Sequence, residues 1–213
     1  MKITGRLVTF SLVLAINFVY IFFYYIRDGY VSFLQWIGLP ITLILAWFFG
    51  RKFDEAKYFS EKDPLTEIYN RRIIEPFFTK ITSIADRNQQ MVTVFLIDVN
   101  NFKMINDQYG HQKGDDLLKH LAKLLVNCMR TSDVVARWGG DEFIIICPNI
   151  TNLAAIDEIN KRINERLETS TFFDLDISLS IGSATYPNEG KNLEQLIRTA
   201  DKKMYKMKIE GKK

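Results

Sequence analysis

The sequence predicts an α+β domain, with helices packed on one mostly antiparallel sheet, preceded by a hairpin of two membrane-spanning helices. Two observations indicate the hairpin: residues 1–50 carry only four charged side chains, and two long apolar runs fill them. A third observation indicates the domain. Beyond residue 50, apolar patterns follow one another in the order helix, strand, helices, hairpin, helix, strand, helix.

The first apolar run, Leu7–Ile26, holds 20 residues without a formal charge. At about 1.5 Å per residue, a helix of that length spans roughly 30 Å of hydrocarbon. The second run, Phe33–Phe49, has Trp36 and Trp47 towards its ends, where tryptophan favours the headgroup level. The connection over 27–32 is short enough for a tight hairpin, so we expect residues 1–50 to form one.

Basic residues predict the orientation of this hairpin. Lys2 and Arg6 precede the first span, and Arg51, Lys52 and Lys57 follow the second. Both termini are therefore expected to be cytoplasmic. A cleaved signal peptide is the competing interpretation, but the run is too long, it lacks a small-x-small cleavage site, and a second span follows.

The remainder of the chain has the composition of an ordinary soluble domain. Its charge is nearly balanced, which argues against a nucleic acid polymer as partner. Cys128 and Cys147 lie in apolar runs without CxxC spacing, and we interpret them as core thiols in a reducing compartment.

The local patterns place the elements of this domain. Residues 51–62 suit a helical linker that ends before Pro64. We expect helices over 71–88, 101–111, 115–129, 151–168 and 193–210, and strands over 91–99, 134–137, 142–147 and 175–186. Gly139 and Gly140 separate two of these strands, and we expect them to supply the positive φ angles of a tight turn.

Three carboxylates stand where this arrangement brings strand ends together. Asp98 ends the first buried strand, and Asp141 and Glu142 lie at the tip of the hairpin. For any one of them alone, a turn cap or a solvated edge is the alternative. If they share a sheet edge, oxygen ligands without a nearby His or Cys cluster favour Mg²⁺ or Mn²⁺. Phosphoryl transfer is the natural chemistry of such a site.

A series of motifs narrows this interpretation. The segment RWGGDEF over 137–143 resembles the GGDEF signature of diguanylate cyclases. Further matches follow the family's order: DPLT at 63–66, NRR at 70–72, DVNNFKMIND at 98–107, YGH at 109–111, GD at 114–115, SIG at 180–182, YP at 186–187, and AD at 200–201 with Tyr205. The resemblance covers about residues 63–212. It implies a nucleotide-cyclase-like fold (ferredoxin-like, palm-type) over 63–213.

The resemblance also implies an activity, the condensation of two GTP into cyclic di-GMP. By this resemblance, Asp98, Asp141 and the backbone carbonyl of Val99 hold two Mg²⁺ or Mn²⁺ ions per active site. Glu142 is the second acid of the signature, placed to assist deprotonation of the attacking 3′-hydroxyl or to complete metal binding. The glycines of the signature, Gly139 and Gly140, let the backbone approach the phosphates.

The substrate-binding residues are carried over in the same way. Asn106 and Asp115 match the pair that reads guanine, and a carboxylate and an amide suit its hydrogen-bonding edge. The residues that match positions near the phosphates are Phe102, Lys103, Lys208 and Lys212. This chain has Gly211-Lys212-Lys213 where the family commonly has Gly-Arg-Asn, and lysine lacks the bidentate fork of arginine.

Partners and regulation follow from the reaction. One GTP per domain makes half a product, so we expect a symmetric homodimer. Arg130 and Asp133 resemble the family's RxxD inhibitory site, where cyclic di-GMP binds and halts catalysis; a solvated turn is the alternative. The expected location is the bacterial inner membrane, in contact with lipid, with the catalytic domain in the cytoplasm.

Two other functions compete with an active cyclase. A degenerate receptor would bind cyclic di-GMP or GTP without turnover, but such receptors usually lose the signature acids that this chain retains. A related cyclase with another nucleotide product would have altered base-reading residues.

Overall fold

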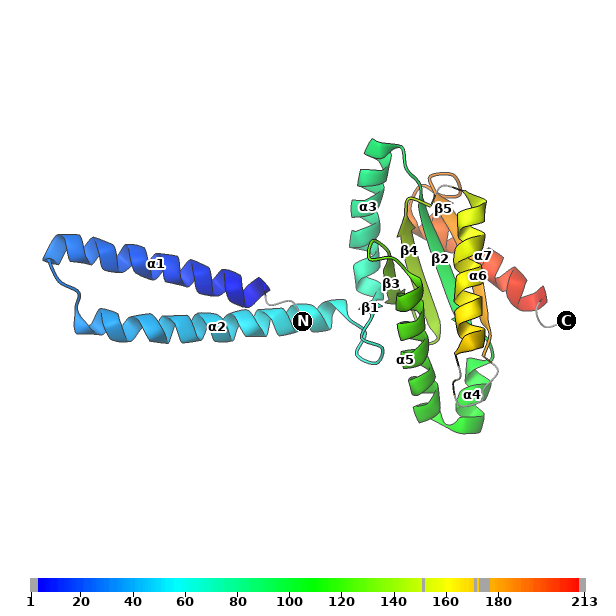
Figure 1. The fold of residues 1–213 in the computed structure, drawn as a ribbon, viewed down its shortest axis with the longest axis horizontal. Helices are drawn as coiled ribbons and strands as arrows, with labels where there is room; N and C mark the ends of the chain where they lie inside the picture. The colour runs from blue at the N-terminus through cyan, green and yellow to red at the C-terminus, as the bar shows by residue number, and fades with distance from the viewer. Residues whose placement is uncertain (1–3, 151, 171, 173–176, 211–213) are drawn as a thin grey trace. The chain divides into compact units, whose positions relative to one another are not determined.

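The computed structural model describes residues 4–150, 152–170, 172 and 177–210. These residues form two compact units, one reaching to Ser60 and the other beginning at Glu61 (Figure 1). Each unit is described by itself below.

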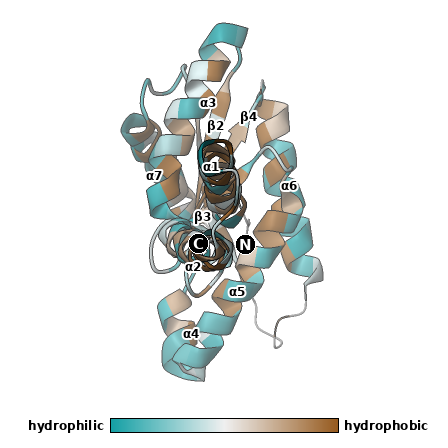
Figure 2. Ribbon diagram, turned by 90° about the vertical axis from the view of Figure 1, so that its left-hand side faces the viewer, coloured by the Kyte–Doolittle hydropathy of each residue, from teal (hydrophilic) through white to brown (hydrophobic). Residues whose placement is uncertain are grey.

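The first unit consists of two helices, α1 (Thr4–Asp28) and α2 (Phe33–Glu61). Both are long and apolar enough to cross a membrane, with mean hydropathies of 2.1 and 1.7. Hydrophobic residues dominate α1 and much of α2 (Figure 2), and no residue of α1 is buried. The second apolar run and the linker expected over 51–62 form one helix, α2, which contains Pro40 and ends just before Asp63-Pro64.

The end of the hairpin at which α1 begins is held by a buried carboxylate. Asp54 of α2 accepts hydrogen bonds from the backbone N–H groups of Gly5 (2.7 Å) and Arg6 (3.2 Å) in the first turn of α1. The Arg6 guanidinium pairs with the same carboxylate at 3.2 Å. Because the first N–H groups of a helix have no partner within it, Asp54 acts as a cap supplied by the other helix.

The second unit is built on a five-stranded sheet with the order β1-β3-β4-β2-β5. Only the β1–β3 pair is parallel, so the mostly antiparallel sheet and its surrounding helices confirm the predicted fold. The strands are β1 (Tyr69–Asn70), β2 (Val92–Val99), β3 (Val134–Arg137), β4 (Glu142–Pro148) and β5 (Leu179–Tyr186). The helices are η1 (Arg71–Ile73), α3 (Ile74–Asn88), α4 (Phe102–Tyr109), α5 (His111–Cys128), α6 (Leu153–Thr169) and α7 (Leu193–Glu210).

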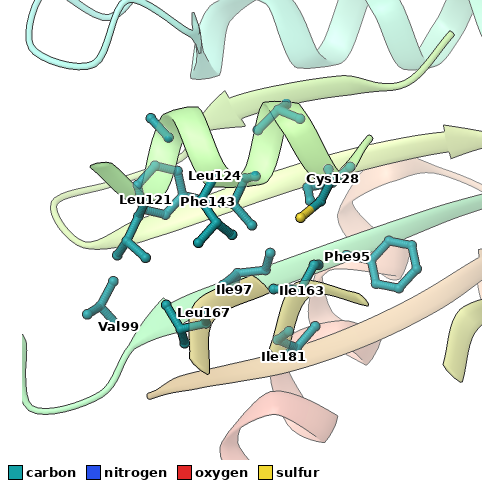
Figure 3. Close-up of a cluster of buried hydrophobic side chains, with 14 of the residues drawn as sticks. Phe95, Ile97, Val99, Leu121, Leu124, Cys128, Phe143, Ile163, Leu167 and Ile181 are labelled. Carbon is teal, nitrogen blue, oxygen red and sulfur yellow. The ribbon is translucent and has the colours of Figure 1, made fainter. Parts of the chain in front are cut away.

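Helices cover both faces of this sheet, which is why every residue of β2 is buried. Successive side chains of a strand point to opposite faces. On one face, Phe95 and Ile97 pack in a cluster with residues of α5 and α6, such as Leu121 and Ile163 (Figure 3). On the other face, residues of β2 such as Leu96 join α3 and α7 in a second cluster. Cys128 and Cys147 are buried free thiols, as their apolar surroundings predicted.

The connection between β3 and β4 corrects one expectation. The hairpin is present, but neither Gly139 nor Gly140 has a positive φ; the glycines with positive φ among the described residues are Gly29 and Gly110. The loop closes instead through the N–H groups of Trp138 and Gly139, which both donate to the Glu142 carbonyl, at 2.8 and 3.3 Å. A Cβ on Gly139 would lie 2.8 Å from Oε2 of Glu142, so this glycine makes room for a carboxylate.

Candidate functional site

The three signature carboxylates converge at one end of the sheet. Asp98, at the end of β2, pairs across the sheet with Glu142, at the start of β4. Residues directly opposite in an antiparallel pair have their Cβ atoms about 5 Å apart on the same face. Asp141 precedes Glu142, and its backbone carbonyl accepts a hydrogen bond from the Val99 N–H at 3.3 Å. The predicted convergence of these residues on one sheet edge is therefore observed.

The carboxylates of this group repel one another electrostatically. Burial raises the pKa of Glu142, and the charges of Asp98, Asp141 and Asp201 raise it further, whereas Lys208 lowers it. The Lys208 ammonium lies 2.5 Å from Oδ1 of Asp98 and partly balances the charge. A cluster of this kind is stabilised by additional positive charge.

The donor atoms of this site suit a divalent cation that is coordinated partly by the protein and partly by the substrate. The described residues contain no group of three or more His, Cys, Asp and Glu side chains arranged to hold a metal ion by themselves. Magnesium is commonly held by one or two carboxylates and completes its coordination with water and substrate phosphates. Asp98, Asp141 and the Val99 carbonyl are consistent with such a partial site.

The turn that carries Asp141 is braced by Arg137. Its Nη2 donates to the Gly140 carbonyl at 2.7 Å, and its Nε lies 3.1 Å from the Gly139 carbonyl and 3.2 Å from that of Gly140. Its Nη1 donates to Oδ1 of Asp63 at 3.1 Å. The guanidinium therefore connects the DPLT and GGDEF segments. No role was predicted for Arg137 from the sequence, although its place two residues before Gly139 was a signal.

A second group of predicted residues lies between α4 and α5. Asn106 of α4 faces Gly114 of α5 so closely that a Cβ on this glycine would collide with the Asn106 amide oxygen and approach Phe102. That oxygen is buried and has no hydrogen-bond partner among the described residues. Asp115 is half-buried in α5, next to Gly114. An unpaired buried carbonyl oxygen beside a carboxylate suits a ligand that donates hydrogen bonds.

The segment between β2 and α4 connects the two groups. Asn100 is tied to the start of β5, since its Nδ2 donates to Ser178 Oγ at 3.0 Å and its Oδ1 accepts from Ser180 Oγ at 2.7 Å. Asn101 has a φ of 58°, which turns the chain from β2 into α4. Phe102 and Lys103 then form the first turn of α4, with Phe102 half-buried and Lys103 exposed. Lys212 lies outside the described residues.

The remaining predicted site lies in the loop before β3. The Arg130 N–H donates to Oδ2 of Asp133 at 2.9 Å, and the Asp133 N–H donates back to the Arg130 carbonyl at 3.0 Å. Both residues line a pocket of about 640 Å³, together with Lys62, Tyr69 and Lys123. None of the signature carboxylates lines this pocket, so it is distinct from the carboxylate group.

Comparison with known proteins identifies the family of this domain. The sequence profile of the family described as "Diguanylate cyclase, GGDEF domain" matches residues 60–213. The chain belongs to the GGDEF-domain diguanylate cyclase family. Diguanylate cyclase DosC of Escherichia coli K12 is 36% identical over 154 residues, which are 70% of this chain and 33% of DosC. The chain therefore spans about a third of the length of that curated relative.

Solved structures of GGDEF domains agree with this assignment. The GGDEF domain of PA1120 (YfiN or TpbB) from Pseudomonas aeruginosa is 31% identical, with a TM-score of 0.65 over 68% of this chain and 92% of that chain. The active GGEEF domain of a diguanylate cyclase from Vibrio cholerae is 33% identical, with a TM-score of 0.62 over 67% of this chain and 92% of that chain.

Proposed function

We propose that this protein is a membrane-anchored diguanylate cyclase that condenses two GTP into one cyclic di-GMP and two pyrophosphates. The observation that carries the proposal is the pairing of Asp98 with Glu142 at the end of the sheet, with Asp141 in the adjoining turn. The family supports it, because relatives described as diguanylate cyclases share this domain.

Each domain binds one GTP in this proposal. The Asn106 amide and the Asp115 carboxylate read the guanine, whose N1–H and N2–H₂ groups provide the donors that the unpaired Asn106 oxygen lacks. Adenine has neither an N1–H nor an N2 amino group, so it does not supply the donors that these two side chains require. The triphosphate is bound near Phe102, Lys103, Lys208 and Lys212. The three lysines supply positive charge to it.

The cofactor of the proposed reaction is Mg²⁺ or Mn²⁺, two ions per active site. Asp98, Asp141 and the Val99 carbonyl hold these ions together with the triphosphate. When bound, they supply charge neutralisation on the phosphates. Gly139 and Gly140, which carry no Cβ, let the turn lie against the phosphates.

Glu142 acts on the attacking group. Its side chain stands opposite Asp98 across the sheet, next to the residues that would hold the triphosphate, so it is placed to accept the proton of the 3′-hydroxyl. The 3′-oxygen of one GTP bonds to the α-phosphorus of the other, the bond to pyrophosphate breaks, and the proton passes to Glu142. A second, symmetric attack closes the ring.

This reaction requires two domains to face each other, so the functional form is a homodimer. Anchoring both chains in one membrane raises their effective concentration. Tryptophans near the span ends and flanking basic residues support two spans over 7–26 and 33–49, with a linker over 51–62 and the cyclase domain in the cytoplasm. The location is the inner membrane of a bacterial cell.

Product feedback operates at Arg130 and Asp133. Their turn lies at the edge of the 640 Å³ pocket, which also presents the cations of Lys62 and Lys123. Bound cyclic di-GMP, with two phosphates and two bases, offers both charge and aromatic surface to such a pocket.

Pyrophosphate release by the full chain in detergent tests the proposal. With GTP and Mg²⁺ we expect steady release, and we expect Asp141→Asn to reduce it at least 100-fold because the metal site loses a charged ligand. Asp157→Asn, an exposed substitution on α6, is the matched control and should leave the rate unchanged. Equal rates for Asp141→Asn and the parent would contradict the assigned site.

A further inference from the structure

A groove lies between α1 and α2 on one side of the hairpin. Its volume is about 450 Å³. The residues that line it include Val13, Ile16 and Asn17 of α1 and Thr42, Leu45 and Phe49 of α2. Spacings of three, four and seven residues place each set on a single helix face. The groove is therefore a continuous, almost entirely apolar depression with one amide in it.

The amide of Asn17 is only half satisfied within the hairpin. Its Nδ2 donates to the Val13 carbonyl at 2.8 Å and to Thr42 Oγ1 at 3.1 Å, so both of its hydrogens are used. Its Oδ1 accepts no hydrogen bond from the residues that the structure describes. Asn17 stands near the middle of the 25-residue helix α1. In a spanning helix that position lies roughly 15–20 Å from either end, beyond the reach of headgroups.

An unpaired carbonyl oxygen is unfavourable at that depth. The hydrocarbon core holds no water to donate a hydrogen bond, and acyl chains have no donors. The missing donor must therefore come from a protein. A second copy of this chain carries one at the same depth, its own Asn17 amide. The hydrogen that Asn17 gives to Val13 is available for exchange, because a carbonyl inside a helix already accepts the backbone N–H four residues later.

We propose that two copies of the hairpin pack groove against groove, with their Asn17 amides exchanging hydrogen bonds at the two-fold axis. Ile16, Leu45 and Phe49, which line the groove and are exposed on a single copy, then pack against the opposite copy. Such an interface is isologous, since each amide both donates and accepts. The inference rests on the proposed membrane location and names the interface that holds the proposed homodimer together.

Counting subunits of the full-length chain in lipid vesicles tests this interface. One dye is attached at a C-terminal tag, and photobleaching steps are counted as the protein is diluted in lipid. We expect the parent to dimerise and Asn17→Leu to weaken the dimer about tenfold, because two exchanged hydrogen bonds are lost.

Two controls separate the exchange from other effects. Ser11→Leu makes a similar polar-to-apolar change at an exposed position of α1 that does not line the groove. Thr42→Val removes the hydrogen-bond partner of Asn17 within the hairpin but keeps the shape of the groove. We expect both variants to dimerise like the parent.

Three results would overturn the interface. They are an unchanged dimer fraction for Asn17→Leu, a parent that stays monomeric because lipid covers its groove, and a Thr42→Val variant as weak as Asn17→Leu. Cyclic di-GMP formation is measured in the same vesicles to keep the two proposals apart. Parent dimers that are sensitive to Asn17→Leu but make no product would support the interface and contradict the proposed function.

Discussion

Arg137 shows how one side chain can position a site that it does not belong to. Its guanidinium donates to the two glycine carbonyls of the signature turn and to Asp63. Asp141 and Glu142 follow that turn directly, so their placement depends on it. Arginine suits this task because its planar fork holds several acceptors at fixed angles, which a lysine ammonium cannot do.

We predict that Arg137→Lys lowers kcat for cyclic di-GMP formation about tenfold or more, while KM for GTP changes less. The charge is retained but the fork that holds the turn is lost. Arg87→Lys, on the exposed side of α3, is the matched control. Steady-state kinetics measure both, and thermal unfolding checks that the variants remain folded. If Arg137→Lys has the kinetics of the parent, the turn keeps its conformation without the guanidinium.

Asp63 gives a prediction of pH dependence. Burial raises the pKa of Asp63, but the hydrogen bonds from Thr66 and Arg137 outweigh it and hold the pKa below its ordinary value. The stability that this carboxylate contributes is thus present above the unfolded-state pKa of about 3.9, and it is lost as the pH falls through the lower folded-state pKa.

Asp63→Asn should therefore cost about 1–3 kcal/mol in the free energy of unfolding at pH 7. The difference from the parent should shrink as the pH falls below about 4. Denaturant titrations of the detergent-solubilised chain at several pH values measure this difference. A difference that stays constant down to the lowest pH at which the chain folds would refute the ionic origin.

For single residues, the sequence predicted which side chains form the site better than it predicted the contacts between them. Asp98 and Glu142 could be placed because strand ends and a hairpin tip are visible in local patterns. The φ angles of Gly139 and Gly140 were predicted wrongly, because the loop is shaped by Arg137 and by the Glu142 carbonyl rather than by a two-residue turn. The closeness of Gly114 to Asn106 arises where α4 meets α5, and no local pattern records such a contact.

Among the elements, α7 packs against β5 with unusual closeness. A Cβ at Gly182 would collide with the backbone of α7 at Ala200 and Met204. This close approach sets the position of α7, the helix that carries Lys208 to Asp98 and Asp201 to the neighbourhood of Glu142. Gly182 is thus required by packing, and it stands in the SIG segment over 180–182 that resembles the family's motif.

We predict that Gly182→Ala destabilises the chain by about 1–3 kcal/mol, because the helix must move to admit one methyl group. Ser183→Ala, at the next position of β5, should change the free energy of unfolding by less than about 0.5 kcal/mol. Thermal or denaturant unfolding measures both variants. If the two substitutions cost the same, the close approach of α7 to β5 does not limit stability.

The elements themselves were largely predictable. The strands β3 and β4 lie where short apolar runs flank the glycine pair, and α3, α5 and α7 follow from apolar spacings of three and four residues. Ends were less predictable: the expected helix over 71–88 begins with the separate turn η1, and α5 begins at His111, earlier than expected. Parts of the strand expected over 175–186 and of the helix expected over 151–168 lie outside the described residues.

At the scale of the whole molecule, we propose that the hairpin dimerises the chain and that the GGDEF domain carries out catalysis. Removing residues 1–50 should leave a domain whose specific activity rises steeply with its own concentration, because pairing becomes a bimolecular step. The full chain in vesicles should show constant specific activity over the same range. Assays at protein concentrations spanning about 100-fold measure this. A truncated domain with concentration-independent activity would show that the domain dimerises by itself.

The sequence could predict this division from composition alone, because charge is nearly absent before residue 50 and balanced after it. The groove between α1 and α2 could not be predicted, since it depends on which faces of the two helices meet. The order of the strands in the sheet likewise depends on contacts between distant segments.

The most direct test is to supply the full chain in vesicles with GTP and Mg²⁺ and to identify every product by mass spectrometry. We expect cyclic di-GMP and two pyrophosphates for each one formed, and at least 100-fold less of both from Asp141→Asn. GTP that is bound but unchanged by a dimeric protein, or that is hydrolysed to GDP and phosphate, would contradict this expectation.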